Sequence, residues 1–255
     1  MQFLKEAAGI VRQYYSYLLT GVGYTMLLAL VGTVAGFCIG LLTGVVRTAP
    51  KSRNAVLRTL HSVVNALIAV YIEVFRSTPM MVQAVFLYYG LKSVFNWTPV
   101  VAGICIISIN TGAYMAEILR SGIQSVDVGQ TEAARSIGMT SAQTMLHVVL
   151  PQGIKNAFPA IGNEFVVNIK DSSVLNAISV TELFFQSNKI AGSIFDFTAT
   201  FLVTALIYLI LTFTTTSILH VIEKRMGRAP SSYPSSQTVP EARLAAGKTN
   251  QSRKE

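Results

Sequence analysis

Hydrophobic residues occur in five long blocks along this chain, separated by shorter polar stretches. Three blocks are free of charge or contain a single charged residue: 22–46, 100–118 and 197–221. A run of about 20 apolar residues is long enough to cross a bilayer as a helix. Two further blocks, at about 62–91 and 154–183, are mostly apolar but contain ionisable residues. The pattern predicts an all-α membrane protein with five transmembrane helices, of which the middle ones are interrupted.

The composition and the distribution of charge support a membrane location. Hydrophobic residues make up 51% of the chain and charged residues only 13%, and this composition is unusual for a soluble domain. The net charge is +8. Lysine and arginine gather between the first two blocks, around the loop between the third and fourth, and after the fifth. Because such residues favour the cytoplasmic side, we expect the N-terminus outside and the C-terminus in the cytoplasm. The positive charge then requires no nucleic acid as a partner.

The two ends of the chain differ from the apolar blocks. Residues 1–18 place apolar side chains at roughly helical spacing and lack the features of a cleavable signal, so we expect an interfacial helix on the outer face. Residues 229–255 are rich in Ser, Pro, Ala and charge, which is typical of a disordered tail. A transmembrane domain over 19–228 lies between them. The two cysteines and three histidines show no spacing typical of metal ligands.

A polar, helix-forming segment at about 127–151 separates the third and fourth blocks. Asp127 is placed to cap a first short helix, and Gln130 to complete a capping box. Gly138 supplies the left-handed residue that ends this helix, and a second capping box begins at Thr140. The segment predicts either a rigid docking element or an ordered loop without a partner.

Two apolar blocks carry a stripe of polar residues on one helix face. The third block presents Asn110, Tyr114 and Glu117, and the fourth presents Glu164, Asn168 and Asp171, with Asn163 and Lys170 beside that face. Residues at i, i+4 and i+7 share a helix face, and an ionisable group in hydrocarbon usually faces a cavity or a partner. The stripes indicate either an aqueous path or polar contacts that join helices. For Lys170 and Asp171 we favour an internal ion pair.

The second block breaks at Arg76-Ser77-Thr78-Pro79. A proline at a first helical position, preceded by Thr78 as a cap, begins a new helical segment. A helix that starts inside the membrane presents a positive dipole end that suits a carboxylate, and Arg76 adds a fixed charge with paired donors. The alternatives are a proline kink without a ligand and a pair between Arg76 and Glu73, one turn earlier.

Several of these segments together resemble a known family of membrane subunits. Glu132-Ala133-Ala134, with Gly138 and Leu150-Pro151, resembles the Glu-Ala-Ala loop of bacterial ATP-binding-cassette importers. YIEVFRSTP at 71–79, AYMAEILR at 113–120, NEF at 163–165 and KDSS at 170–173 resemble the polar amino-acid permeases of the histidine, glutamine and arginine family. Ser77 and Ser121 stand where that family usually has glycine. The resemblance covers about 21–228.

The resemblance implies a transport subunit in a bacterial cytoplasmic membrane, with no catalysis and no cofactor or metal of its own. Its partners would be a second permease subunit, two cytoplasmic ATPase subunits that hold ATP and magnesium, and an extracytoplasmic amino-acid-binding protein. The residues expected to couple the permease to the ATPases are Asp127, Gln130, Glu132, Ala133, Ala134 and Gly138. Small Ala133 and Ala134 would permit close approach of the ATPase, and Glu132 would supply a polar contact.

The expected substrate site combines the break in the second block with the polar face of the fourth. Its residues are Arg76, Thr78, Asn163, Glu164 and Asn168. The expected internal polar network consists of Glu73, Asn110, Tyr114, Glu117, Lys170 and Asp171. Every amino acid carries an ammonium group, so Glu164 leaves the side-chain preference open among glutamine, arginine, histidine and cystine.

An ion-coupled secondary amino-acid transporter is the alternative function, because buried charges also serve ion coupling. Such transporters often contain inverted repeats, whereas this chain shows no convincing repeat and five spans divide poorly into halves. A membrane enzyme is not expected, because the chain offers no nucleophile–base or metal constellation.

Overall fold

The computed structural model describes residues 2–48 and 54–226, and every regular element in these two ranges is a helix. In chain order the helices are α1 (Gln2–Thr48), α2 (Ala55–Ser77), α3 (Met80–Phe95), α4 (Pro99–Gln124), α5 (Val128–Ser136), α6 (Ser141–Thr144), a π-helical turn (Met145–Val149), α7 (Leu150–Asp171), a 3-10 helix (Ser172–Ile178), α8 (Leu183–Ile194) and α9 (Phe197–Arg225). The all-α prediction is confirmed. The tail expected at 229–255 lies outside the described residues.

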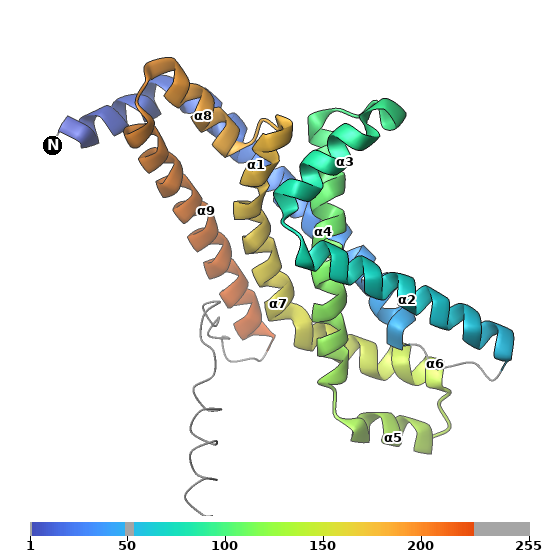
Figure 1. The fold of residues 1–255 in the computed structure, drawn as a ribbon. Helices are drawn as coiled ribbons and strands as arrows, with labels where there is room; N and C mark the ends of the chain where they lie inside the picture. Colours follow the sequence, from blue (N-terminus) through green and yellow to red (C-terminus); the bar gives the residue numbers. More distant parts are fainter. Residues whose placement is uncertain (1, 49–53, 227–255) are drawn as a thin grey trace, which may run out of the picture.

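Four of the described helices are long and apolar enough to cross a membrane: α1 over Glu6–Arg47, α2, α4 and α9. The expected second span is two helices, because the chain changes direction between α2 and α3 (Figure 1). With 16 residues, α3 is only about 24 Å long and shorter than a bilayer's apolar core. The expected fourth span, at about 154–183, is divided among the 22-residue α7, the 3-10 helix and the start of α8. The count of five spans stays a prediction.

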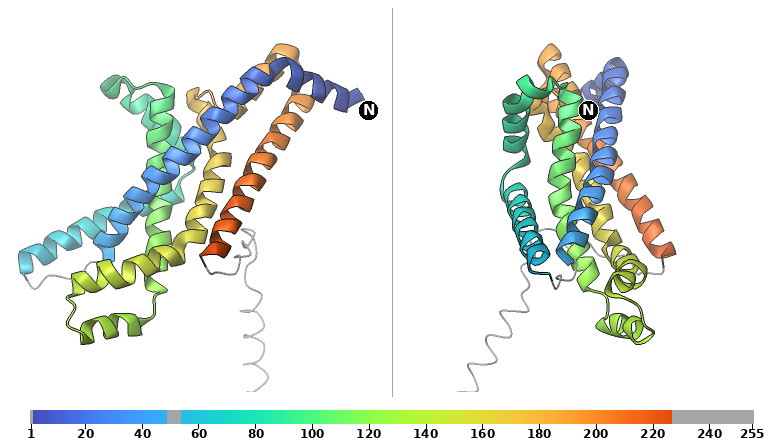
Figure 2. Two further views of the ribbon diagram at one scale, coloured as in Figure 1. Left: turned by 180° about the vertical axis from the view of Figure 1, so that it is seen from behind. Right: turned by 90° about the vertical axis from the view of Figure 1, so that its right-hand side faces the viewer.

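The N-terminal segment continues directly into the first expected span. α1 runs from Gln2 to Thr48 with non-helical dihedral angles at Tyr14, and its first turns bend away from the long remainder there (Figure 2). Ala7 and Ile10 are buried in a cluster with residues of α8 and α9. The N-terminal turns therefore pack on the protein itself, while their place at a membrane surface stays a prediction.

α4 lies at the centre of the bundle, where α1 and α7 pack against it. Glycines at every fourth position of α1 allow a close approach to α4, as small residues do in membrane bundles. A Cβ atom at Gly36 would stand only 2.7 Å from Cγ2 of Thr111. This packing fully buries Ile107, Met115 and Leu119 of α4.

The two ends of the bundle carry different structures. α5 lies at one end, beyond the C-terminal end of α4, and α6 leads from this end toward α7, whereas α8 and the first turns of α1 lie at the other end (Figures 1 and 2). The break between α2 and α3 lies between these ends. The polar stripes of α4 and α7 run along the bundle and pass this break.

Candidate functional site

A cavity of about 510 Å³ opens at the junction between α2 and α3. Its lining comprises Arg76, Ser77, Thr78, Pro79 and Met80 at the junction, Asn110 and Tyr114 of α4, and Glu164, Val167 and Asp171 of α7. Three of the five expected substrate-binding residues meet here: Arg76, Thr78 and Glu164. Asn163, which is partly exposed, and Asn168 are not among the residues that line this cavity.

The helix break differs by one residue from the prediction. Thr78 and Pro79 are both extended, so α3 begins at Met80 and Pro79 is its N-cap. The residue before a proline avoids helical angles, and Pro79 itself has a ψ of 133°. Thr78 does not cap α3, because its Oγ1 donates to the Val74 carbonyl oxygen at 2.7 Å. The N-terminus of α3 therefore lacks a side-chain cap and borders the cavity with its positive dipole end.

Gln83, which is not among the residues expected from the sequence, holds the junction together. Its Nε2 donates to the Thr78 carbonyl oxygen at 2.9 Å, to Thr78 Oγ1 at 2.8 Å and to the Phe75 carbonyl oxygen at 3.0 Å. Its Oε1 accepts from Nδ2 of Asn110 at 2.9 Å. The side chain thus replaces hydrogen bonds that the helix break removes and ties the junction to α4. A glutamine one turn after a break in an apolar block was the available signal.

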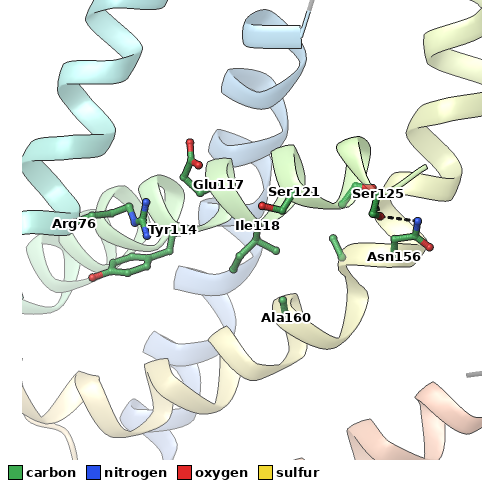
Figure 3. Close-up of a pocket in the computed structure, with 10 residues that line it drawn as sticks. Arg76, Tyr114, Glu117, Ile118, Ser121, Ser125, Asn156 and Ala160 are labelled. Atoms are coloured by element: carbon green, nitrogen blue, oxygen red, sulfur yellow. Dashed lines mark hydrogen bonds between the residues drawn. The ribbon is translucent and has the colours of Figure 1, made fainter. Parts of the chain in front are cut away.

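Arg76 packs on an aromatic ring instead of pairing with Glu73. Its guanidinium carbon lies 5.5 Å from the centroid of the Tyr114 ring, and Figure 3 shows the two side chains together. Glu73 is exposed and accepts a hydrogen bond from Ser77 Oγ at 3.1 Å. The alternative pair of Arg76 with Glu73 is therefore wrong. A cation–π contact uses the face of the guanidinium, so its edge donors stay available for a carboxylate.

The expected pair of Lys170 and Asp171 is also wrong, because these two described residues form no ion pair. Adjacent helical residues point in different directions. Asp171 lines the cavity, whereas the exposed Lys170 is not among the lining residues. Glu164 and Asp171 lie on the same face of α7, about 10 Å apart along the helix axis. The cavity therefore has an acidic wall on α7 opposite the positive junction of α2 and α3.

Asn168 joins three helices. Its Oδ1 accepts from Thr111 Oγ1 of α4 at 3.0 Å, and its Nδ2 donates to Thr33 Oγ1 of α1 at 2.9 Å. The residue is only 2% exposed. Both the oxygen and the nitrogen of the amide thus have a partner within the chain, and a contact of Asn168 with a substrate stays a prediction.

Glu117 forms a separate cluster nearer to α5. Its carboxylate pairs with Arg47 of α1 and with Arg120 of α4, the latter at 2.7 Å. The expected single network is therefore divided into a cluster of Gln83 and Asn110 at the junction and a cluster around Glu117. Tyr114 lies between Asn110 and Glu117 in the sequence of α4, and its ring contacts the Arg76 guanidinium.

The polar segment starts two helices at the expected caps, but only α5 is a separate short helix. The second helix does not end before Pro151, because α6 continues through the π-helical turn into α7 without a non-helical residue. Asp127 caps α5 by accepting from the Gly129 amide at 2.7 Å, but the expected box with Gln130 is absent, and the Gln130 Oε1 accepts from Gln152. Gly138 has the expected positive φ of 88°. The amides of Gly138 and Met139 donate to the carbonyl oxygens of Arg135 and Ala134, at 3.0 and 3.1 Å respectively, in the pattern of a Schellman motif. The second box, between Thr140 and Gln143, is confirmed.

The two alanines of this segment face different ways. Ala134 is the buried residue of α5, with 4% exposure, whereas Glu132 and Ala133 are exposed. Val128 and Ile137 are 70% and 80% exposed at the two ends of α5. A partner would therefore meet Glu132, Ala133 and these apolar side chains, while Ala134 packs inside the chain.

Comparison with known proteins identifies the family. Residues 36–228 match the family described as the binding-protein-dependent transport system inner membrane component. The chain belongs to this family. This permease is 34% identical over 212 residues to the glutamine transport system permease protein GlnP of Escherichia coli (strain K12), covering 82% of the permease and 92% of the relative. It is 34% identical over 222 residues to the L-cystine transport system permease protein TcyB of Bacillus subtilis (strain 168), covering 86% and 90%.

Solved structures agree with this assignment. The permease matches a chain in the crystal structure of an amino acid ABC transporter with histidines, with a TM-score of 0.73 and 35% identity over 84% of the permease and 96% of that chain. A chain of the MetNI methionine ABC transporter gives a TM-score of 0.70 with 23% identity, covering 85% and 99%. This second match supports the fold.

Proposed function

We propose that the permease is a subunit of an ATP-driven amino-acid importer and that the cavity at the α2–α3 junction binds the amino acid during passage. The observation that carries this proposal is the arrangement of opposite charges around one cavity. A free amino acid is a zwitterion, with a carboxylate and an ammonium group on the same carbon atom. A site with a positive wall and an acidic wall matches both groups.

In this proposal the carboxylate of the amino acid binds at the positive wall, which is the junction of α2 and α3. Arg76 offers guanidinium donors that can bind a carboxylate through two parallel hydrogen bonds. The N-terminus of α3, which has no side-chain cap, adds amide donors and a dipole of the same sign. Thr78 lines the same wall, but its hydroxyl donates to Val74. Because both Thr78 Oγ1 and its carbonyl oxygen also accept from Gln83, Thr78 shapes this wall and offers no hydroxyl donor to the carboxylate.

The ammonium group is placed at α7. Glu164 is buried and Asp171 is exposed, and both line the cavity. A cavity of about 510 Å³ lies within the common range for small-molecule sites. The relatives named for glutamine and for cystine are equally similar to this chain. The class of substrate in our proposal is therefore a polar amino acid, without a choice among them.

Import also requires partners for the ends of the bundle. We assign an exposed surface of α5 to contact with an ATPase subunit; its residues are Glu132, Ala133, Val128 and Ile137. This surface is partly apolar and lies on a short capped helix. In this arrangement a second permease subunit completes the path, two ATPase subunits hold ATP and magnesium, and a binding protein delivers the amino acid at the end that carries α8. The N-terminus is then outside and α5 is cytoplasmic. The family match favours this function over the ion-coupled alternative.

Uptake and ATP hydrolysis by the complete complex in lipid vesicles test this function. With the cognate ATPase and binding protein, one or a few polar amino acids are expected to stimulate hydrolysis. Glu164→Gln keeps the size of the side chain but removes its charge, so stimulation is expected to need about tenfold more substrate, which corresponds to 1.4 kcal/mol. Glu73→Gln is the matched control, since Glu73 is exposed and does not line the cavity. Equal behaviour of the two variants contradicts the site, and amino-acid flux without ATPase subunits contradicts ATP-driven import.

A further inference from the structure

A second cavity, of about 520 Å³, adjoins the first at Arg76 and Tyr114. It is lined by Arg76, by α4 from Tyr114 onward with its C-cap Ser125, and by Asn156, Ala157 and Ala160 of α7. Figure 3 shows Arg76 over Tyr114 on one side of this cavity and the hydrogen bond from Asn156 to Ser125 on the other. Arg76 and Tyr114 are the two residues that line both cavities.

The order of the lining residues places the cavities one after the other along the bundle. On α4, Asn110 borders the first cavity, Tyr114 borders both, and Ser125 borders the second. On α7, which runs in the opposite direction (Figure 1), Asp171 borders the first cavity and Asn156 the second. The second cavity therefore lies toward α5. From Asn110 to Ser125 the two cavities extend along about 22 Å of α4.

We propose that the Tyr114 ring, held by Arg76, is the barrier between the substrate cavity and an exit compartment on the α5 side. This inference rests on the proposed function of the first cavity. The contact joins α2 to α4 where the two cavities adjoin, with 5.5 Å between the guanidinium carbon and the ring centroid. A cation–π contact is moderate in strength, so relative movement of the two helices can break it and a side-chain rotation can reform it.

Arg76 can also stay in contact with a substrate that moves from the first cavity to the second. Because it lines both cavities, a carboxylate can keep this partner while the rest of the molecule passes Tyr114. The ammonium group has no carboxylate partner that lines both cavities. Glu164 and Asp171 border the first cavity, whereas Glu117, the carboxylate in the lining of the second, is already paired with Arg47 and Arg120. The exit compartment therefore binds a zwitterion more weakly than the substrate cavity does, which favours release toward α5.

A cysteine reporter in the second cavity tests the barrier without any substrate. Ser121→Cys is placed in the complete complex after Cys38 and Cys105 are replaced by serine, and sealed vesicles receive a membrane-impermeant thiol reagent on one side. With Tyr114 intact, we expect reaction from the α5 side and protection from the opposite side. Tyr114→Ala removes the ring, and reaction from the opposite side is expected to rise about five- to thirtyfold, the effect of losing a cation–π contact. Tyr114→Phe keeps the ring and is expected to remain within about twofold of the parent.

Two outcomes overturn the barrier: equal reaction from both sides with Tyr114 intact, or an unchanged rate in Tyr114→Ala. If Tyr114→Ala does not assemble with its partners, Tyr114→Leu takes its place, because leucine fills space but offers no aromatic face. The readout is independent of the substrate assignment. If Glu164→Gln behaves like its control while Tyr114→Ala still opens the second cavity to the opposite side, the substrate site is wrong and the barrier stands.

Discussion

Replacing either Ala133 or Ala134 of α5 by leucine distinguishes packing within the permease from docking on a partner. Leucine at either position adds three carbon atoms to the side chain. Ala134 is 4% exposed, so Ala134→Leu must displace neighbouring atoms, and such overpacking costs about 1–3 kcal/mol. Ala133 is exposed, so Ala133→Leu meets no tightly packed neighbour and surface changes of this kind stay within about 0.5 kcal/mol.

Hydrogen exchange of the α5 amides in the isolated permease measures this difference. A loss of about 1–3 kcal/mol in local stability accelerates exchange of residues 128–136 by about five- to 150-fold in Ala134→Leu, whereas Ala133→Leu stays within about threefold of the parent. In the complete complex, both variants are expected to insert normally and to reduce substrate-stimulated ATP hydrolysis. Ala133→Leu would act by steric conflict with the ATPase and Ala134→Leu by loosening α5.

The result that refutes this reasoning is an inverted or equal pattern of exchange. Fast exchange in Ala133→Leu with protection in Ala134→Leu would mean that the opposite face of α5 packs on the permease. Normal stimulation of ATP hydrolysis in Ala133→Leu, with unchanged α5 exchange, would remove Ala133 from the docking surface.

Two further predictions concern residues with defined local geometry. Gly138→Ala places a Cβ atom on a residue with φ of 88°, which costs about 1–2 kcal/mol and is expected to accelerate amide exchange at the end of α5 without changing insertion; exchange equal to the parent would show that the Schellman turn is not needed. Asn168→Leu removes both interhelical hydrogen bonds with Thr33 and Thr111, at a cost of about 1–3 kcal/mol, so thermal unfolding of the purified permease is expected to begin about 2–10 °C lower; an unchanged transition would show that this amide does not stabilise the bundle.

The helix break illustrates both the reach and the limit of sequence reasoning. Its position at residues 76–79 follows from proline chemistry, and Arg76, Thr78 and Glu164 do meet at one cavity. Sequence reasoning misplaced the cap by one residue because helical dihedral angles start only after Pro79. It also missed Gln83, since a single glutamine in an apolar block has many explanations until its partners at Phe75 and Asn110 are known.

The sequence by itself determined the properties that depend on neighbouring residues. Apolar blocks, the proline break, the caps at Asp127 and Thr140 and the left-handed Gly138 all follow from side-chain chemistry within a few positions. The motifs at 71–79 and 132–134 pointed to the family for the same reason, because they are contiguous in the chain. Local chemistry is therefore sufficient for the helices and for the class of protein.

Only the tertiary structure decided which side chains meet. Asn168 contacts Thr33, which lies 135 positions away, and Arg76 selects Tyr114 over the nearby Glu73 because α2 packs against α4. The burial of Ala134 beside the exposed Ala133 likewise depends on how α5 packs. Such choices follow from the relative positions of whole helices, which helical periodicity within one segment does not specify.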